Sequence, residues 1–154
     1  MIGRKLLIPF NFTLQDRKAL EFVSQNFAGQ EDIEITLFHA YTPVPEIEAV
    51  ESMVTGKLRG NLSYLNQKVL EKESALEKIE SELASSSSAA GRVRHVFRAR
   101  KKEVAAEIID AVNGERFNIV VLNRKPNKVS RFFSASVHQK VIAACKGATV
   151  CIVS

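Results

Sequence analysis

The sequence lacks the features that mark membrane-spanning and disulfide-rich proteins. No stretch approaches the roughly 18 consecutive apolar residues that a spanning helix needs, and Met1-Ile-Gly-Arg-Lys5 leads straight into an apolar run without a cleavable signal. Only two cysteines are present, Cys145 and Cys151, and no histidine or acidic residue is spaced with them for a metal. We therefore expect a cytoplasmic protein with two buried, unreactive thiols and no metal site.

Recognisable catalytic motifs are also missing. The chain has no Gly-x-Ser-x-Gly elbow, no Walker loop and no carboxylate pair that can be placed in a crevice. His39 lies inside an apolar run, which favours a core histidine over a catalytic one. His138 stands close to Ser136, but that spacing alone does not make a nucleophile and base pair. We expect no enzymatic activity.

What is present is an ordinary globular composition with alternating strand and helix patterns. The 154 residues, of which 45% are hydrophobic and 25% charged, predict a single domain over 1–154. The pattern predicts an α/β fold, with an open, mostly parallel five-stranded sheet and helices on both faces. The expected strands are residues 4–10, 33–41, 92–98, near a sheet edge, 117–122 and 148–153.

The longest helical pattern runs from Glu46 to Leu83. One helix of that length spans about 55 Å, more than a domain of this size is wide, so we predict a break at Gly56 and Gly60. The favoured interpretation of the remaining apolar stripe is a helix packed on the sheet, and a coiled-coil seam for a partner is the alternative. Residues 85–91 have the composition of a linker. The stripe consists of Leu58, Leu62, Leu65, Val69, Leu76, Ile79 and Leu83.

Three segments resemble the universal stress protein family: Leu6-Leu-Ile-Pro-Phe-Asn-Phe-Thr13, Thr36–Tyr41 and Ile119–Ser154. Its members open with a strand ending in Pro-Val-Asp-Gly-Ser. They close with a strand, a Gly-x-x-Gly loop, nine residues, a Gly-Ser pair, a helix and a strand. The resemblance implies a Rossmann-like sheet of the adenine-nucleotide alpha-hydrolase type and a homodimer paired through Ala148–Val153. It places a ligand site at Asn11, Thr13, Ala40, Asn123, Arg124, Lys125, Ala135, Ser136 and Val137.

The nucleotide motif of the ATP-binding members is altered in this chain. Asn11 stands where they carry aspartate, and their glycines fall on Asn123, Pro126 and Ala135. A phosphate cradle needs several backbone N–H groups turned toward one point, which glycine permits and proline prevents. The free amides at the start of the last helix remain. We predict a degenerate pocket, no cofactor, and a non-enzymatic protein that acts in stress response or regulation through homodimer and protein contacts.

The uneven charge leaves two alternatives open. Residues 31–84 hold eleven acidic and five basic side chains, whereas residues 85–154 hold thirteen basic and four acidic ones. The first alternative is a small-molecule switch that binds ATP or another anion through the basic loop 123–137 and Arg98 to Lys102. An exposed ion pair yields roughly 0.2–1 kcal/mol, whereas micromolar affinity needs about 8 kcal/mol. The second, nucleic-acid binding, is least favoured, because no recognition-helix motif is present.

Overall fold

The computed structural model describes residues 3–45, 53–85, 91–124 and 137–154. Strands and helices alternate along these residues, as the sequence predicts. The strands are β1 (Arg4–Pro9), β2 (Ile33–Tyr41), β3 (Val93–Ala99), β4 (Ile119–Asn123) and β5 (Thr149–Val153). The helices are α1 (Leu14–Asn26), α2 (Met53–Ser85), α3 (Val104–Glu115) and α4 (Val137–Ala144).

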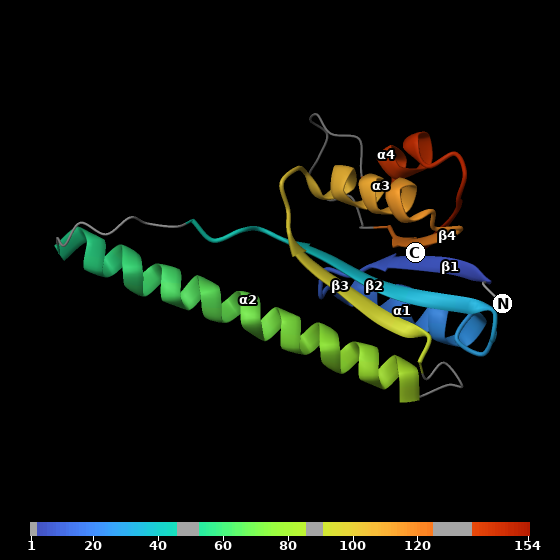
Figure 1. Ribbon diagram of the computed structural model, residues 1–154, viewed down its shortest axis with the longest axis horizontal. Helices are drawn as coiled ribbons and strands as arrows, with labels where there is room; N and C mark the ends of the chain where they lie inside the picture. The colour runs from blue at the N-terminus through green and yellow to red at the C-terminus, as the bar shows by residue number, and fades with distance from the viewer. Residues whose placement is uncertain (1–2, 46–52, 86–90, 125–136) are drawn as a thin grey trace.

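The five strands form one sheet in the order β3-β2-β1-β4-β5. Every neighbouring pair is parallel, so the sheet is fully parallel rather than mostly so, and the predicted α/β class is confirmed. The edges are β3 and β5 (Figure 1). The prediction that the strand of residues 92–98 lies near a sheet edge is confirmed. The chain moves outward from β1 through β2 to β3, and then returns to add β4 and β5 on the other side of β1.

Each face of the sheet carries its own apolar core. On one face, Ala19 and Val23 of α1 and Leu76 of α2 pack with β1 and β2. On the other, Ile108 of α3 and Val141 of α4 pack with β4 and the opposite face of β1. Successive strand residues point to opposite faces, so strands covered on both sides are apolar throughout. Leu6, Leu7 and Ile8 are consequently all inaccessible to solvent.

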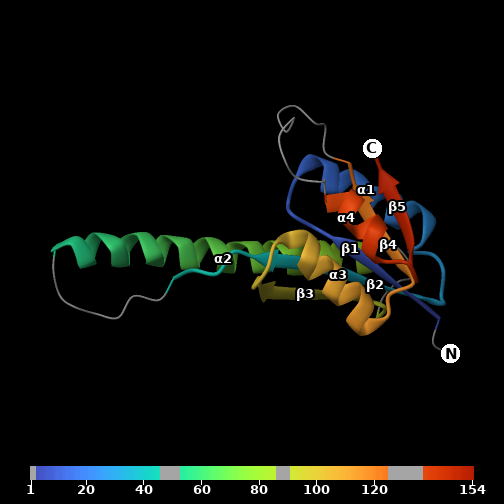
Figure 2. The same cartoon turned by 90° about the horizontal axis from the view of Figure 1, so that it is seen from above.

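Helix α2 corrects one prediction, because no break occurs at Gly56 or Gly60. The helix is continuous over its 33 residues, a length of about 50 Å. A glycine inside a helix costs only about 1 kcal/mol relative to alanine, which the rest of the helix outweighs. A helix longer than the domain is wide is possible because α2 does not stay over the sheet. Its N-terminal part extends well beyond the sheet (Figures 1 and 2).

Only the C-terminal part of α2 is packed on the sheet. Leu76, Ile79 and Leu83 are buried where α2 lies against β3 and β2, whereas Leu58 and Leu65 are each 44% exposed. The predicted stripe is therefore divided: its last part covers the sheet, as expected, and its first part does not. Of the predicted linker, Ser85 is the last residue of α2, and residues 86–90 lie outside the described residues.

Candidate functional site

The reversal of strand order places a candidate ligand crevice between the carboxyl ends of β1 and β4. In open parallel sheets, ligands bind where neighbouring strands lead their connections to opposite sides. Here β1 leads toward β2 and β4 leads toward β5. The predicted site residues Asn11, Thr13, Asn123 and Arg124 all follow or end these two strands. Their role in ligand binding stays a prediction.

The start of α1 is fixed by a reciprocal capping box. Thr13 is the N-cap residue, and its Oγ1 accepts a hydrogen bond from the backbone N of Asp16 at 3.1 Å. In return, Asp16 Oδ2 accepts from the backbone N of Thr13 at 3.2 Å, from Thr13 Oγ1 at 2.8 Å and from the backbone N of Asn11 at 2.8 Å. The Asp16 carboxylate therefore satisfies donors that α1 and the end of β1 leave without intrahelical partners.

The same carboxylate connects the two sides of the crevice. The Asn123 amide Nδ2, at the end of β4, donates to Asp16 Oδ1. Asp16 is only 3% exposed, so the crevice floor between β1 and β4 is occupied by a negatively charged group with four hydrogen-bond donors already around it. A phosphate brought to this point meets a carboxylate of the same sign. We refer to this contact as the Asp16–Asn123 bridge.

Asp16 is not among the residues predicted for the site, although its spacing from Thr13 is that of a capping box. Asn11 keeps its backbone N bonded to Asp16, while its residue as a whole is exposed. Arg124 continues the sheet: its backbone N donates to the Val153 carbonyl at 2.9 Å. Ala40, at the corresponding end of β2, is partly buried against the core on the α3 and α4 face.

The remaining predicted site residues are only partly described. Val137 is the first residue of α4 and is 39% exposed. Lys125, Ala135 and Ser136 lie outside the described residues, as does most of the basic loop.

Two of the four cations in the basic cluster after β3, Arg98 to Lys102, are paired with acidic residues. Arg98 Nη2 lies 3.6 Å from Glu107 Oε2, and Lys102 Nζ lies 2.8 Å from Asp110 Oδ2. The hydrogen bond and charge of Asp110 raise the pKa of the Lys102 ammonium. These contacts neutralise two of the cations that the anion-binding alternative requires.

His39 is a core histidine, as predicted. It is 4% exposed, and its Nδ1 lies 2.8 Å from the Phe10 carbonyl oxygen, so Nδ1 carries the proton. Burial lowers the pKa of His39, and the nearby charge of Lys72 acts in the same direction. Its ring contacts Phe12 edge-on, with centroids 5.1 Å apart. Phe12 has a φ of 61°, a left-handed conformation that costs a non-glycine residue about 1 kcal/mol.

The two cysteines are both free. Cys145 is buried, as predicted, but Cys151 on the edge strand β5 is only partly buried, which corrects that prediction. Burial raises the pKa of both thiols, and a protonated thiol is a poor nucleophile. No helix among the described residues has the length and apolar character needed to cross a membrane.

Comparison with known proteins agrees with the fold. The sequence model of the universal stress protein family matches residues 3–153. No curated protein matches the chain significantly by sequence. Among solved structures, the hypothetical protein MJ0577 superposes with a TM-score of 0.70 at 19% identity, covering 99% of this chain and 96% of that one.

Two further solved structures are similar over their whole length. The universal stress protein UspA from Lactobacillus plantarum has a TM-score of 0.68 at 14% identity, covering 100% of this chain and 99% of its own. The universal stress protein from Archaeoglobus fulgidus in complex with dAMP has a TM-score of 0.63 at 15% identity, covering 100% of both chains. With the family match extending over nearly every residue, this chain belongs to the universal stress protein family.

Proposed function

We propose that this chain is a non-enzymatic universal stress protein that acts in stress response or regulation through homodimer and protein contacts, and that its nucleotide crevice is degenerate. The observation that carries the proposal is the Asp16–Asn123 bridge, which fills the crevice floor with a buried carboxylate. A triphosphate does not fit these residues, because it needs N–H donors and the donors at this point are already bonded to Asp16.

The Archaeoglobus fulgidus protein in complex with dAMP supports the alternative, a switch that binds a nucleotide or another anion. In this chain the alternative depends on Arg124, Lys125, Lys128 and Arg131 of the basic loop. Four exposed ion pairs contribute at most about 4 kcal/mol, which corresponds to a dissociation constant of about 1 mM. We therefore favour the degenerate pocket.

Isothermal titration with ATP and Mg²⁺ tests this proposal. For the wild-type chain we expect no saturable binding at micromolar ATP. A matched variant, Asn11→Asp with Asn123→Gly, Pro126→Gly and Ala135→Gly, restores the motif of the ATP-binding members and should bind more tightly than the wild type. Micromolar binding by the wild type would overturn the proposal. Loss of such binding in Arg124→Ala with Arg131→Ala would then assign it to the basic loop.

We propose that the homodimer forms through β5, the apolar strand at one edge of the sheet. An edge strand presents unpaired N–H and C=O groups that can pair with another strand. β5 pairs with β4 on one side only, and Ile152 is 39% exposed. The universal stress protein family assignment is consistent with this interface.

Light scattering at micromolar concentration tests the homodimer. We expect the wild-type chain to be dimeric and Ile152→Lys to be monomeric, because a charge on the edge strand opposes strand pairing. Val104→Lys, at an exposed apolar residue of α3, is the control and should remain dimeric. A monomeric wild type, or an Ile152→Lys variant as dimeric as the wild type, would contradict the β5 interface.

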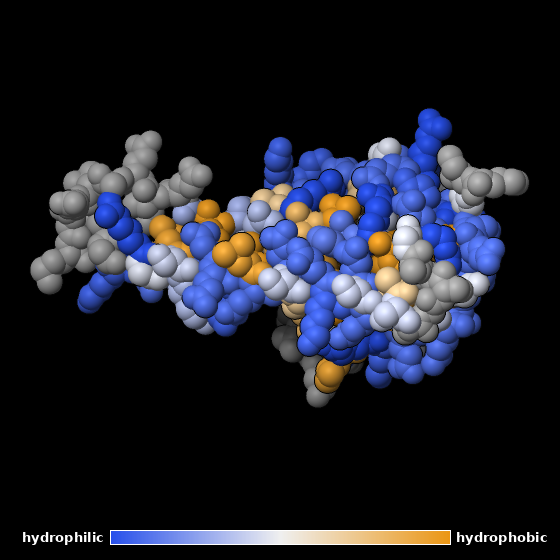
Figure 3. All heavy atoms as spheres, turned by 60° about the horizontal axis from the view of Figure 1, so that its bottom comes forward, coloured by the Kyte–Doolittle hydropathy of each residue, from blue (hydrophilic) through white to orange (hydrophobic). Residues whose placement is uncertain are grey.

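We propose that the protein contacts involve the part of α2 that extends beyond the sheet, residues 57–70, which we call the α2 arm. Apolar side chains lie along it (Figure 3): Leu58 is 44% exposed, Tyr64 59%, Leu65 44% and Leu70 62%. Leu58 and Leu65, seven residues apart, lie on the same face of the helix, and an apolar face of this kind fits an amphipathic partner helix. The coiled-coil alternative from the sequence therefore becomes the favoured interpretation for the arm.

The charge of the α2 arm indicates which helix would bind it. The arm carries Lys57 and Arg59 without an acidic residue, whereas Lys68 is paired with Glu71, the first residue after the arm, at 3.2 Å. A second copy of the arm would bring these cations against one another, which is unfavourable. We therefore propose an acidic amphipathic helix of another protein as the partner. A cytoplasmic location and a single domain over 1–154 stay predictions.

A further inference from the structure

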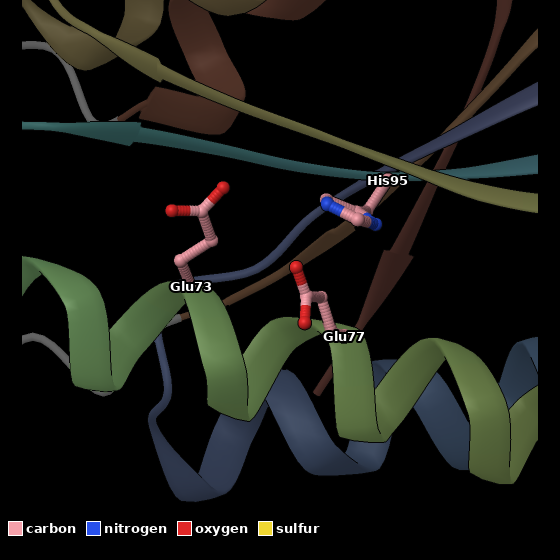
Figure 4. Close-up of side chains that lie close together, drawn as sticks. All are labelled: Glu73, Glu77 and His95. Carbon is pink, nitrogen blue, oxygen red and sulfur yellow. The ribbon is translucent and has the colours of Figure 1, made fainter.

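Three potential metal ligands meet between α2 and β3, on the opposite side of the molecule from β5. They are Glu73 and Glu77 of α2 and His95 of β3, and one ligand atom of each lies within 4.8 Å of the others. Figure 4 shows the two carboxylates rising from the helix toward the imidazole of the strand. We propose that these three residues bind a divalent transition-metal ion, Zn²⁺ in the first instance, and thereby join α2 to the edge of the sheet.

The backbone brings the ligands together without strain. Glu73 and Glu77 are four residues apart, so they lie one above the other on the same face of the helix. Leu76 and Ile79, on the same turns, are buried in the core, which fixes the position of the helix over the sheet at this point. The α2 arm has no such anchor, so this is the segment of α2 where a ligand set can be held in place.

The imidazole is already oriented for metal binding. His95 Nδ1 contacts Glu80 Oε2, and this leaves Nε2 as the nitrogen available to a metal. Metal-bound histidines almost always have their second ring nitrogen bonded to a carboxylate, carbonyl or water, which fixes the ring and increases its basicity. Glu80 therefore acts as a positioning residue and Glu73, Glu77 and His95 as ligands. The His95 and Glu80 side chains are 25% and 27% exposed, so the site is open to solvent on one side.

The charges favour a cation. Among the described residues, neither the Glu73 nor the Glu77 carboxylate has an ion-pair or hydrogen-bond partner. Two like charges four residues apart on a helix repel each other, and a dication between them replaces that repulsion with attraction. One imidazole and two carboxylates are a ligand set that suits Zn²⁺. Mg²⁺ and Ca²⁺ prefer sites made of oxygen ligands alone. With ligands at about 2.0–2.2 Å from zinc, the three atoms must approach to about 3.5 Å of one another, a small side-chain rotation.

Titration of the metal-stripped, untagged full chain with ZnCl₂ tests the site. We expect one Zn²⁺ per chain with a micromolar dissociation constant and a rise in melting temperature. His95→Asn and Glu77→Gln should each weaken binding at least tenfold and remove the rise. Glu82→Gln, an exposed acid on the same helix, and His138→Asn, a histidine on α4, should bind like the wild type. Because Glu77 is exposed, its variant keeps the test valid if His95→Asn does not fold.

The role of Glu80 gives a second readout. Loss of an outer carboxylate partner typically weakens metal binding 10- to 100-fold, so Glu80→Gln should fall in that range while Glu82→Gln does not. The proposal is overturned if the wild type shows no saturable Zn²⁺ binding up to 1 mM. It is also overturned if His95→Asn or Glu77→Gln binds as tightly as the wild type, and Zn²⁺ bound by thiols would be recognised by its loss in Cys151→Ser.

Discussion

Replacing Asp16 with alanine should lower the free energy of unfolding by about 3 kcal/mol, because several hydrogen-bond donors lose their acceptor, whereas the bond from the backbone N of residue 16 to Thr13 Oγ1 is kept. The backbone N–H groups of Asn11 and Thr13 both donate to Asp16 Oδ2, and the Asn123 amide donates to Oδ1. Alanine accepts none of these bonds and leaves the donors without partners near the core. Urea denaturation followed by circular dichroism measures the change.

Asp110→Ala is the matched control for Asp16→Ala. Asp110 is also a helical aspartate with a bonded partner, but its pair with Lys102 is exposed, with the side chains 53% and 59% accessible. An exposed pair contributes at most about 1 kcal/mol, so this variant should stay close to the wild type. Asp16→Asn, which keeps one carbonyl acceptor, should fall between the two. If Asp16→Ala were no less stable than Asp110→Ala, the crevice floor would not depend on the Asp16–Asn123 bridge, and the proposed degenerate pocket would lose its main support.

One contact of Asp16 can be predicted from local sequence, and the other cannot. Thr13 and Asp16 are three residues apart, so their capping box follows from spacing alone. Asn123 reaches Asp16 only because β1 and β4 are neighbours in the sheet, and no local pattern encodes that pairing. The glycine losses at 123, 126 and 135 indicated a weak phosphate loop, but they did not indicate that a carboxylate would occupy the floor of the crevice.

The difference between local spacing, which the sequence shows, and contacts that depend on the fold also applies to the proposed metal site and to α2. The spacing of Glu73 and Glu77 is visible in the sequence, whereas their closeness to His95 depends on how α2 lies along β3. The break predicted at Gly56 and Gly60 assumed that every helix of a compact domain stays within its width. That assumption fails when part of a helix is left uncovered, and the apolar pattern is similar in the covered and uncovered parts.

The two parts of α2 should therefore respond differently to the same substitution. Leu76→Ala should lower the free energy of unfolding by about 3 kcal/mol, because removal of a fully buried leucine side chain costs 2–5 kcal/mol, and Leu76 is 0% exposed. Leu65→Ala should change it by no more than about 0.5 kcal/mol, as surface substitutions usually do. Urea denaturation of both variants at one protein concentration gives the comparison.

Leu65 should instead matter for binding. A synthetic acidic amphipathic helix should bind the wild-type chain, and Leu58→Ala and Leu65→Ala, which change one face of the helix, should each weaken this binding. Leu76 variants are left out of this test because they are unstable. Raising the salt concentration should weaken it too, because the cations of the α2 arm attract the peptide. If Leu65→Ala destabilised the isolated chain as much as Leu76→Ala, and more so at higher protein concentration, the arm would already be covered by another copy. The part of α2 beyond the sheet would then be a self-association surface, and the acidic partner helix would be the wrong occupant.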